Sequence, residues 1–113
     1  MSVVTGAAAE QHAAEHLEKA GLTVLARNVQ CRWGEIDLIL RDGNYWVFAE
    51  VKARRSQQFG GGLAAVTASK QRKLRRTAEW YLNYRKKPQQ ACRFDVIEVN
   101  LATQEITWIR NAF

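Results

Sequence analysis

Apolar residues change their spacing several times along the chain, and each change predicts a new element. Spacings of three and four residues predict helices over residues 5–20 and 68–86, with Thr67 as the N-cap of the second. Apolar runs, alternating or continuous, predict five strands, over residues 22–26, 35–40, 45–52, 93–99 and 105–109. The polar stretch 28–34 and the glycine-rich stretch 56–62 are expected to be loops. The predicted order is therefore α-β-β-β-α-β-β, an α/β class with one mixed sheet of about five strands flanked by helices.

The length and composition predict a single globular domain over residues 1–113. Hydrophobic residues make up 47% of the chain and charged residues 25%, which are ordinary proportions for one domain with its own core. No signal peptide is recognised at the N-terminus and no stretch approaches 18 consecutive apolar residues, so we expect no membrane partner. Cys31 and Cys92 lie far apart and form no CxxC pair, which favours reduced thiols and a cytoplasmic location.

The predicted hairpin around residues 42–44 brings acidic side chains together. Side chains alternate along a strand, and the paired residue numbers of an antiparallel hairpin have a constant sum. A loop at residues 43–44 pairs Asp37 with Glu50 and Glu35 with Lys52. A loop at residues 42–43 pairs Glu35 with Glu50 instead. Both registers place the same four side chains on one face, namely Glu35, Asp37, Glu50 and Lys52, whereas a three-residue loop would separate them.

This cluster of acids needs a compensating charge, and two sources remain open. Carboxylates that face each other destabilise a sheet, and a divalent cation such as Mg²⁺ binds one or two carboxylates together with water. The alternative is an ordinary ion-pair network that joins Glu35 to Lys52 and Asp37 to Arg32. Glu10 lies on the apolar stripe of the first helix and also needs a partner, which favours the cation.

The net charge of +6 is unevenly distributed and predicts a polyanionic partner. Residues 1–50 hold seven acids and four bases, whereas residues 51–78 hold eight bases and no acid. Such a block is the electrostatic footprint expected for nucleic acid, although a basic face that only contacts solvent is the plainer alternative. Beyond Lys52, the predicted phosphate contacts are Arg54, Arg55, Lys70, Arg72, Lys73, Arg75 and Arg76. Trp33 would stack on an unpaired base if it is exposed, and would belong to the core if it is buried.

Several stretches resemble the YraN-like family of small bacterial proteins. They are GAAAE ending at Glu10, WGEIDLI, FAEVKARR, FGGGLAAVTASKQRKL and RFDVIEV, and they cover nearly the whole chain in order. That family is similar to the restriction-endonuclease-like superfamily, in particular to archaeal Holliday-junction resolvases. The superfamily pattern is an acid, a spacer and then (Asp/Glu)-x-Lys, which here corresponds to Asp37, twelve intervening residues and then Glu50-Val51-Lys52. Ile36 stands where many superfamily members have proline.

The resemblance implies a restriction-endonuclease-like fold and an endonuclease that hydrolyses phosphodiester bonds with Mg²⁺ or Mn²⁺. Its expected substrate is structured or branched DNA rather than RNA, and a homodimer is expected because the resolvases act as dimers. The implied catalytic residues are Glu10, Asp37, Glu50 and Lys52. The implied metal ligands are Asp37, Glu50, the Val51 carbonyl and Glu35, which otherwise pairs with Lys52. Two alternatives stay open: a nucleic-acid-binding protein without turnover, and an adaptor that uses the basic face on an acidic protein.

Overall fold

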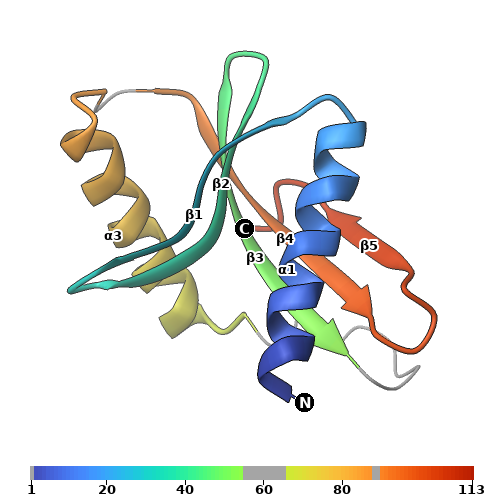
Figure 1. The fold of residues 1–113 in the computed structure, drawn as a ribbon. Helices are drawn as coiled ribbons and strands as arrows, with labels where there is room; N and C mark the ends of the chain where they lie inside the picture. The colour runs from blue at the N-terminus through green and yellow to red at the C-terminus, as the bar shows by residue number, and fades with distance from the viewer. Residues whose placement is uncertain (1, 55–65, 88–89) are drawn as a thin grey trace.

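The computed structural model describes residues 2–54, 66–87 and 90–113 (Figure 1). Its elements are α1 (Ser2–Lys19), β1 (Thr23–Cys31), β2 (Gly34–Asp42), β3 (Tyr45–Arg54), α3 (Ala68–Tyr84), β4 (Cys92–Asn100) and β5 (Ile106–Ile109). The predicted order α-β-β-β-α-β-β is confirmed. Neither of the two described helices combines the length and the apolar character needed to cross a bilayer. The predicted loop at residues 56–62 lies outside the described residues.

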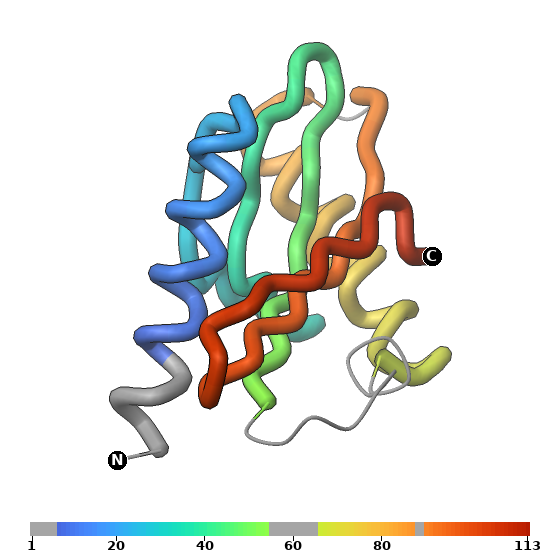
Figure 2. Tube along the Cα trace, turned by 90° about the vertical axis from the view of Figure 1, so that its right-hand side faces the viewer, coloured from blue at the N-terminus to red at the C-terminus, as the bar shows by residue number. Residues whose placement is uncertain are grey.

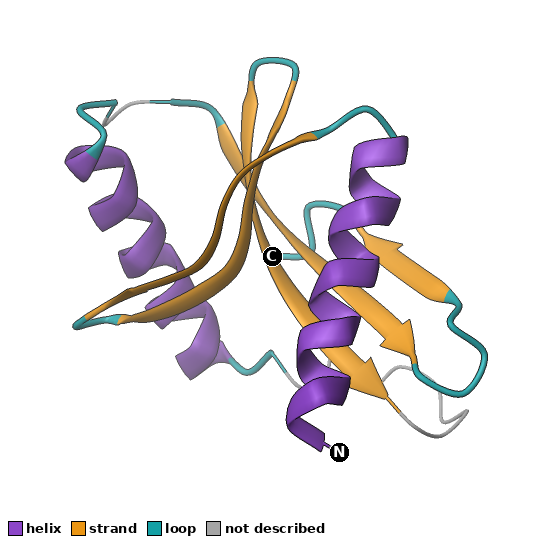
Figure 3. Cartoon of the chain, viewed as in Figure 1, coloured by secondary structure: helices purple, strands orange, loops and turns teal. Residues whose placement is uncertain are grey.

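The five strands form one mixed sheet, as the sequence predicts (Figure 3). The spatial order follows the chain, from β1 at one edge to β5 at the other. Strands β3 and β4 are parallel, and the other neighbouring pairs are antiparallel. Because parallel neighbours need a crossover connection, α3 occurs in the chain between β3 and β4. This arrangement is the mixed α/β fold, with one five-stranded sheet and two helices, that the sequence predicts.

The two helices cover opposite faces of the sheet and create two apolar cores (Figure 2). Against one face, α1 buries Ala9, Ala13, Ala14 and Leu17 next to Leu38, Leu40, Val47 and Ala49. Against the other, α3 buries Leu74, Ala78, Tyr81 and Leu82 next to Ile39, Phe48, Phe94 and Val96. The start of α3 is the predicted one, since the Thr67 hydroxyl accepts a hydrogen bond from the Lys70 amide at 3.3 Å.

The prediction of a loop over residues 28–34 is wrong. Strand β1 continues to Cys31 and pairs with Gly34, so that only Arg32 and Trp33 form the turn. The polar residues that suggested a loop belong to an edge strand, whose backbone is paired by β2 while its polar side chains face solvent. Gly34 has φ of +151°, and a Cβ there would lie 3.6 Å from the Cβ of Lys73. The φ therefore explains the glycine, since a Cβ would make only an ordinary van der Waals contact with α3.

The hairpin between β2 and β3 has the first of the two predicted registers. Asp42 pairs with Tyr45, which makes residues 43–44 the loop, and Gly43 takes a φ of +59° there. The pairs continue only to Leu38 and Ala49. Beyond that point β2 curves away from β3, as Figure 1 shows, while β3 continues beside β4 as far as Arg54. A split thus opens between β2 and β3 where Asp37 and Glu50 would have paired.

Candidate active site

Asp37 and Val51 meet at the point where β2 and β3 separate. Asp37 is only 9% exposed, and its Oδ2 accepts a hydrogen bond from the Val51 amide at 2.8 Å. The Asp37 carboxylate thus accepts from a β3 amide where a backbone carbonyl of β2 would have done so if the hairpin had continued. Because the amide and the carbonyl of a strand residue point to the same side, the Val51 carbonyl also faces the split. The split therefore presents carboxylate and carbonyl oxygens together.

Glu50 is the most strongly perturbed group of this site. Its pKa is raised from the ordinary value of 4.5 to about 8, first by burial and then by a hydrogen bond with Asp37 and by the charge of that carboxylate. Lys52 and Lys70 oppose the rise through their positive charges, without cancelling it. At neutral pH Glu50 therefore retains its proton, because burial and the neighbouring Asp37 carboxylate outweigh the charges of Lys52 and Lys70.

Glu10, on α1, lies close enough to Asp37 to be affected by its charge. Its pKa is raised by burial, by the charge of Asp37 and, more weakly, by that of Glu35, while a hydrogen bond with Asn28 and the charge of Arg27 oppose the rise. The structure thus groups the four predicted catalytic residues around Asp37 and Glu50. They come from three elements: Glu10 from α1, Asp37 from β2, and Glu50 and Lys52 from β3.

Glu35 lies at the margin of this group rather than opposite Lys52. The β2–β3 pairing ends before it, and Glu35 instead pairs with Gln30 of β1, whose Nε2 donates to its Oε2 at 3.1 Å. Among the described residues, the alternative ion pairs of Glu35 with Lys52 and of Asp37 with Arg32 do not form. Neither of the two predicted ion pairs therefore compensates the Asp37–Glu50 pair, on which the charges of Lys52 and Lys70 act.

The oxygen atoms at the split suit a hard divalent cation. Mg²⁺ and Mn²⁺ bind carboxylate and carbonyl oxygens, and Mg²⁺ keeps several water ligands instead of requiring a complete protein cage. Within residues 2–54, 66–87 and 90–113, no three acidic, histidine or cysteine side chains converge as a metal site. The donor set of Asp37, Glu50 and the Val51 carbonyl fits an ion that completes its coordination with water or substrate.

The raised pKa of Glu50 predicts a specific dependence of stability on pH. Between pH 4.5 and about 8 the folded state binds the extra proton and the unfolded state does not, so the free energy of unfolding should fall as the pH rises through this window. In EDTA, Glu50→Gln should equal the wild type at pH 5 and exceed it at pH 8 by on the order of 2 kcal/mol, after allowance for solvent screening. Urea unfolding at both pH values measures this difference. An equal pH slope in wild type and variant would contradict it.

The predicted phosphate-binding residues divide into two groups. Arg54 donates to Glu98 at 3.1 Å and is mostly buried, whereas Arg55 lies outside the described residues. The remaining five are exposed on α3: Lys70, Arg72, Lys73, Arg75 and Arg76. No ion pair within the described parts of the chain involves any of these five. Arg75 lies over the rings of Phe94 and Phe113, at 5.0 and 5.6 Å from their centres.

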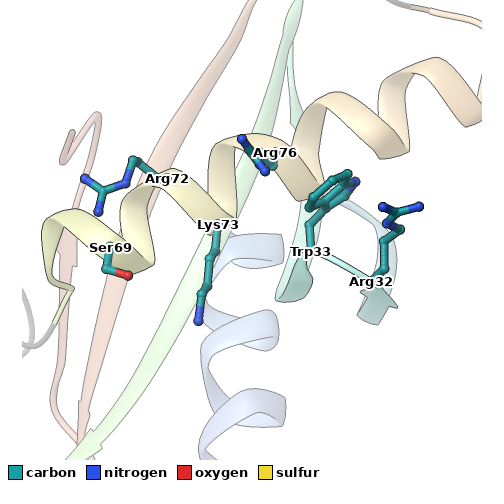
Figure 4. Close-up of a pocket in the computed structure, with 6 residues that line it drawn as sticks. All are labelled: Arg32, Trp33, Ser69, Arg72, Lys73 and Arg76. Carbon is teal, nitrogen blue, oxygen red and sulfur yellow. The ribbon is translucent and has the colours of Figure 1, made fainter.

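A hollow beside α3 was not expected from the sequence. It has a volume of about 390 Å³ and is lined by Arg32, Trp33, Ser69, Arg72, Lys73 and Arg76 (Figure 4). Trp33 is half-buried in the wall of this hollow. Its exposure is thus intermediate between the exposed and the buried position that the sequence left open. The available signal was the sequence Arg-Trp-Gly before β2, because a two-residue turn there would have projected both side chains from the end of the hairpin.

Asp95 is buried away from the split and has a structural role. It is 1% exposed and accepts hydrogen bonds from the Arg93 side chain at 3.1 Å, the Trp108 indole at 2.9 Å and the Asn111 amide at 2.9 Å. Arg93 also pairs with Asp42 at 2.9 Å. This network joins β4 to β5, to the C-terminal segment and to the end of β2.

Comparison with known proteins now identifies the family. A sequence profile of the uncharacterised protein family UPF0102 matches residues 9–99, a range that includes the four predicted catalytic residues. The chain belongs to this family. UPF0102 is the YraN-like family, so the resemblance inferred from the sequence motifs is confirmed.

Curated relatives from the UPF0102 family match the chain over almost its full length. A UPF0102 protein of Legionella pneumophila is 43% identical over 114 residues, which cover all of this chain and 97% of the relative. A UPF0102 protein of Shewanella frigidimarina is 49% identical and covers 96% of this chain and 98% of the relative. A UPF0102 protein of Nitrosomonas eutropha is 48% identical, and the match covers 96% of this chain and 91% of the relative. These matches identify the family and do not by themselves assign an activity.

Proposed function

We propose that the protein is a metal-dependent endonuclease that hydrolyses phosphodiester bonds in structured DNA at the split between β2 and β3. The observation that carries the proposal is the Asp37–Glu50 pair. Two carboxylates are held together there, and burial and Asp37 raise the pKa of Glu50 to about 8 despite the charges of Lys52 and Lys70. Such a pair is costly to keep unless it binds a cation, and perturbed carboxyls of this kind are typical of functional sites.

Asp37, Glu50 and the Val51 carbonyl would hold Mg²⁺ or Mn²⁺ in this proposal. When bound, the ion supplies positive charge that polarises a phosphoryl oxygen and lowers the pKa of water. The Val51 amide keeps Asp37 oriented through its 2.8 Å hydrogen bond, so this ligand is positioned before the ion arrives. Glu10 would act through water molecules around the ion, because the charge of Asp37 acts on its carboxyl group, and Glu35, whose charge acts on Glu10, would act in the same way.

Two lysines complete the proposed chemistry from different elements. The charge of Lys52 acts on Glu50 from the same strand, and an ammonium group there would orient the attacking water or stabilise charge developing on the phosphate. Lys70 acts on Glu50 from the first turn of α3, where backbone amides also favour phosphate. The exposed cations further along α3 would neutralise the DNA backbone and position it without reading its sequence.

The test is a cleavage assay with the purified full-length chain and Mg²⁺ or Mn²⁺. The panel holds junction, flap, blunt duplex and single-stranded DNA and an RNA hairpin, and Asp37→Asn protein purified in parallel measures contaminating nuclease. We expect cleavage of at least one structured DNA by the wild type, abolished by EDTA. Cleavage no higher than that of the variant on every substrate would overturn the enzyme proposal.

Binding measured in EDTA separates the alternatives to this proposal. DNA affinity should fall steeply with salt, because each phosphate contact releases counterions. Salt-sensitive binding without cleavage would favour a nucleic-acid-binding protein that lacks turnover. A flat response to salt would contradict both nucleic-acid functions and favour the adaptor.

A further inference from the structure

The hollow beside α3 is built by the close approach of the β1–β2 turn to the helix. Cys31 pairs with Gly34, and this two-residue turn projects Arg32 and Trp33 toward α3. The guanidinium carbons of Arg32 and Arg76 flank the Trp33 ring at 4.6 and 4.8 Å from its centre (Figure 4). Two elements distant in sequence thus meet in one aromatic and cationic stack.

The charge of the hollow indicates an anionic ligand. Its lining contains four cations, Arg32, Arg72, Lys73 and Arg76, all of them exposed, and the Ser69 hydroxyl. In the part of the chain that the structure describes, none of the four forms an ion pair with an acid. Cations gathered in this way repel one another, and an incoming phosphate relieves that repulsion.

The aromatic residues indicate that the ligand also carries a flat ring. A second hollow of about 440 Å³ adjoins the first, and Trp33 and Arg76 line both. Trp80 lines the second hollow and stacks on Tyr84, with ring centres 5.6 Å apart. Cations beside aromatic faces are typical of surfaces that bind single-stranded nucleic acid, where bases stack on the rings and phosphates contact the cations. The bases of an intact duplex are already stacked and cannot use such faces.

The position of the hollow connects it to the candidate active site. Lys70, whose charge acts on Glu50, is followed on the same helical face by Lys73 and Arg76. Each step of three residues advances about 4.5 Å along the helix axis. A nucleic-acid strand that leaves the split can therefore follow these three cations directly into the hollow.

We propose that the hollow between the β1–β2 turn and α3 binds an unpaired strand of the substrate. Phosphates contact Arg72 and Lys73. A base stacks on an outer guanidinium plane of the stack that Arg32, Trp33 and Arg76 form, which Trp33 holds in place. The inference rests on the proposed function in one respect, namely that the partner is nucleic acid. It adds that the substrate carries an unpaired segment next to the bond that is cut.

The test measures DNA binding by fluorescence anisotropy in EDTA, where the full-length chain cannot use a metal. One probe is a duplex with an unpaired arm, and the other is a blunt duplex of equal charge. The wild type should prefer the armed duplex. Trp33→Ala should weaken binding of the armed duplex by about tenfold and of the blunt duplex by less than about twofold. Tyr45→Ala, which removes an exposed aromatic ring from the other hairpin, should leave both affinities within about twofold.

A second pair of variants keeps the test decisive if Trp33→Ala does not fold. Arg76→Gln and Arg110→Gln each remove an exposed guanidinium that lies over a tryptophan, at 4.8 and 3.9 Å respectively. Only Arg76→Gln should reduce the preference for the armed duplex.

Three results would overturn the inference. The first is equal wild-type affinity for both probes, and the second is an equal loss of affinity for both probes in Trp33→Ala or Arg76→Gln. The third is that polyglutamate competes with the armed duplex as effectively as single-stranded DNA of equal charge does. These outcomes are separate from the failure of the nuclease proposal. A protein that prefers the unpaired arm but cuts no substrate would overturn only the enzyme proposal. A protein that cuts DNA without this preference would overturn only the inference about the hollow.

Discussion

Replacing Asp37 with asparagine should reduce metal-dependent cleavage by on the order of a thousandfold or more, the scale of effect seen when a group that stabilises the transition state is removed. The amide keeps the shape of the side chain and an oxygen that can still accept from the Val51 amide at this position. It removes the negative charge and one of the two oxygens that would hold the ion. The fold and DNA binding in EDTA should therefore survive while the chemistry is lost.

Single-turnover cleavage of the best substrate from the panel measures this effect. Glu105→Gln is the matched control, because it makes the same acid-to-amide change at an exposed position after β4, and it should cleave at the wild-type rate. A variant at Asp37 that keeps even half of the wild-type rate would show that the split is not the catalytic centre.

Asp95→Ala should be the most destabilising of the changes considered. It removes the buried carboxylate that accepts from Arg93, Trp108 and Asn111, and it leaves a guanidinium that is 14% exposed with Asp42 as its remaining partner. Breaking a buried ion pair by removing one partner costs about 3–5 kcal/mol. We expect a loss toward the lower end of this range, about 3 kcal/mol, because Asp42 still compensates part of the charge.

Urea unfolding of wild type and Asp95→Ala at pH 7 provides the measurement. Glu105→Gln again serves as the control, and a surface change of this kind should alter the free energy of unfolding by less than about 0.5 kcal/mol. If Asp95→Ala costs no more than this control, the network does not hold β4, β5 and the C-terminal segment together.

The sequence predicted the elements whose signals are local. The start of α3 at Thr67 and the strands at the centre of the sheet follow from a capping residue and from apolar runs. The edge strand β1 was predicted too short because its residues 27–30 include polar side chains that face solvent. Its strand conformation comes from pairing with β2, which no local pattern reports.

The candidate site was predicted in part, for a similar reason. A two-residue loop at 43–44 keeps odd positions of β2 opposite even positions of β3, and from this alternation the sequence predicted that Asp37 and Glu50 lie close together. The sequence did not reveal that β2 and β3 pair only from Leu38 to Asp42, so the Glu35–Lys52 pair that this one of the two registers implies does not form. The separation depends on how the sheet twists and curves, which is set by packing on both faces.

Beyond the Arg-Trp-Gly turn that forms one wall, the sequence offered no signal for the hollow beside α3. Trp33 and Arg76 lie far apart in the chain, and each looks ordinary within its own segment. Their contact depends on the β1–β2 turn lying against the helix, and Gly34 permits that turn because its φ of +151° is one that other residues rarely adopt. Such a site arises only when two elements are packed together.

The most direct test of the account is a titration of the full-length chain with Mn²⁺, in which the free ion is counted by its paramagnetic resonance signal and the bound ion is obtained by difference. If Asp37 and Glu50 form a metal site, the wild type should bind about one ion per chain, as expected for two carboxylates and a carbonyl. Glu105→Gln should bind in the same way, and Asp37→Asn should lose the site. Equal binding by wild type and Asp37→Asn, or no binding by the wild type at millimolar Mn²⁺, would contradict the account.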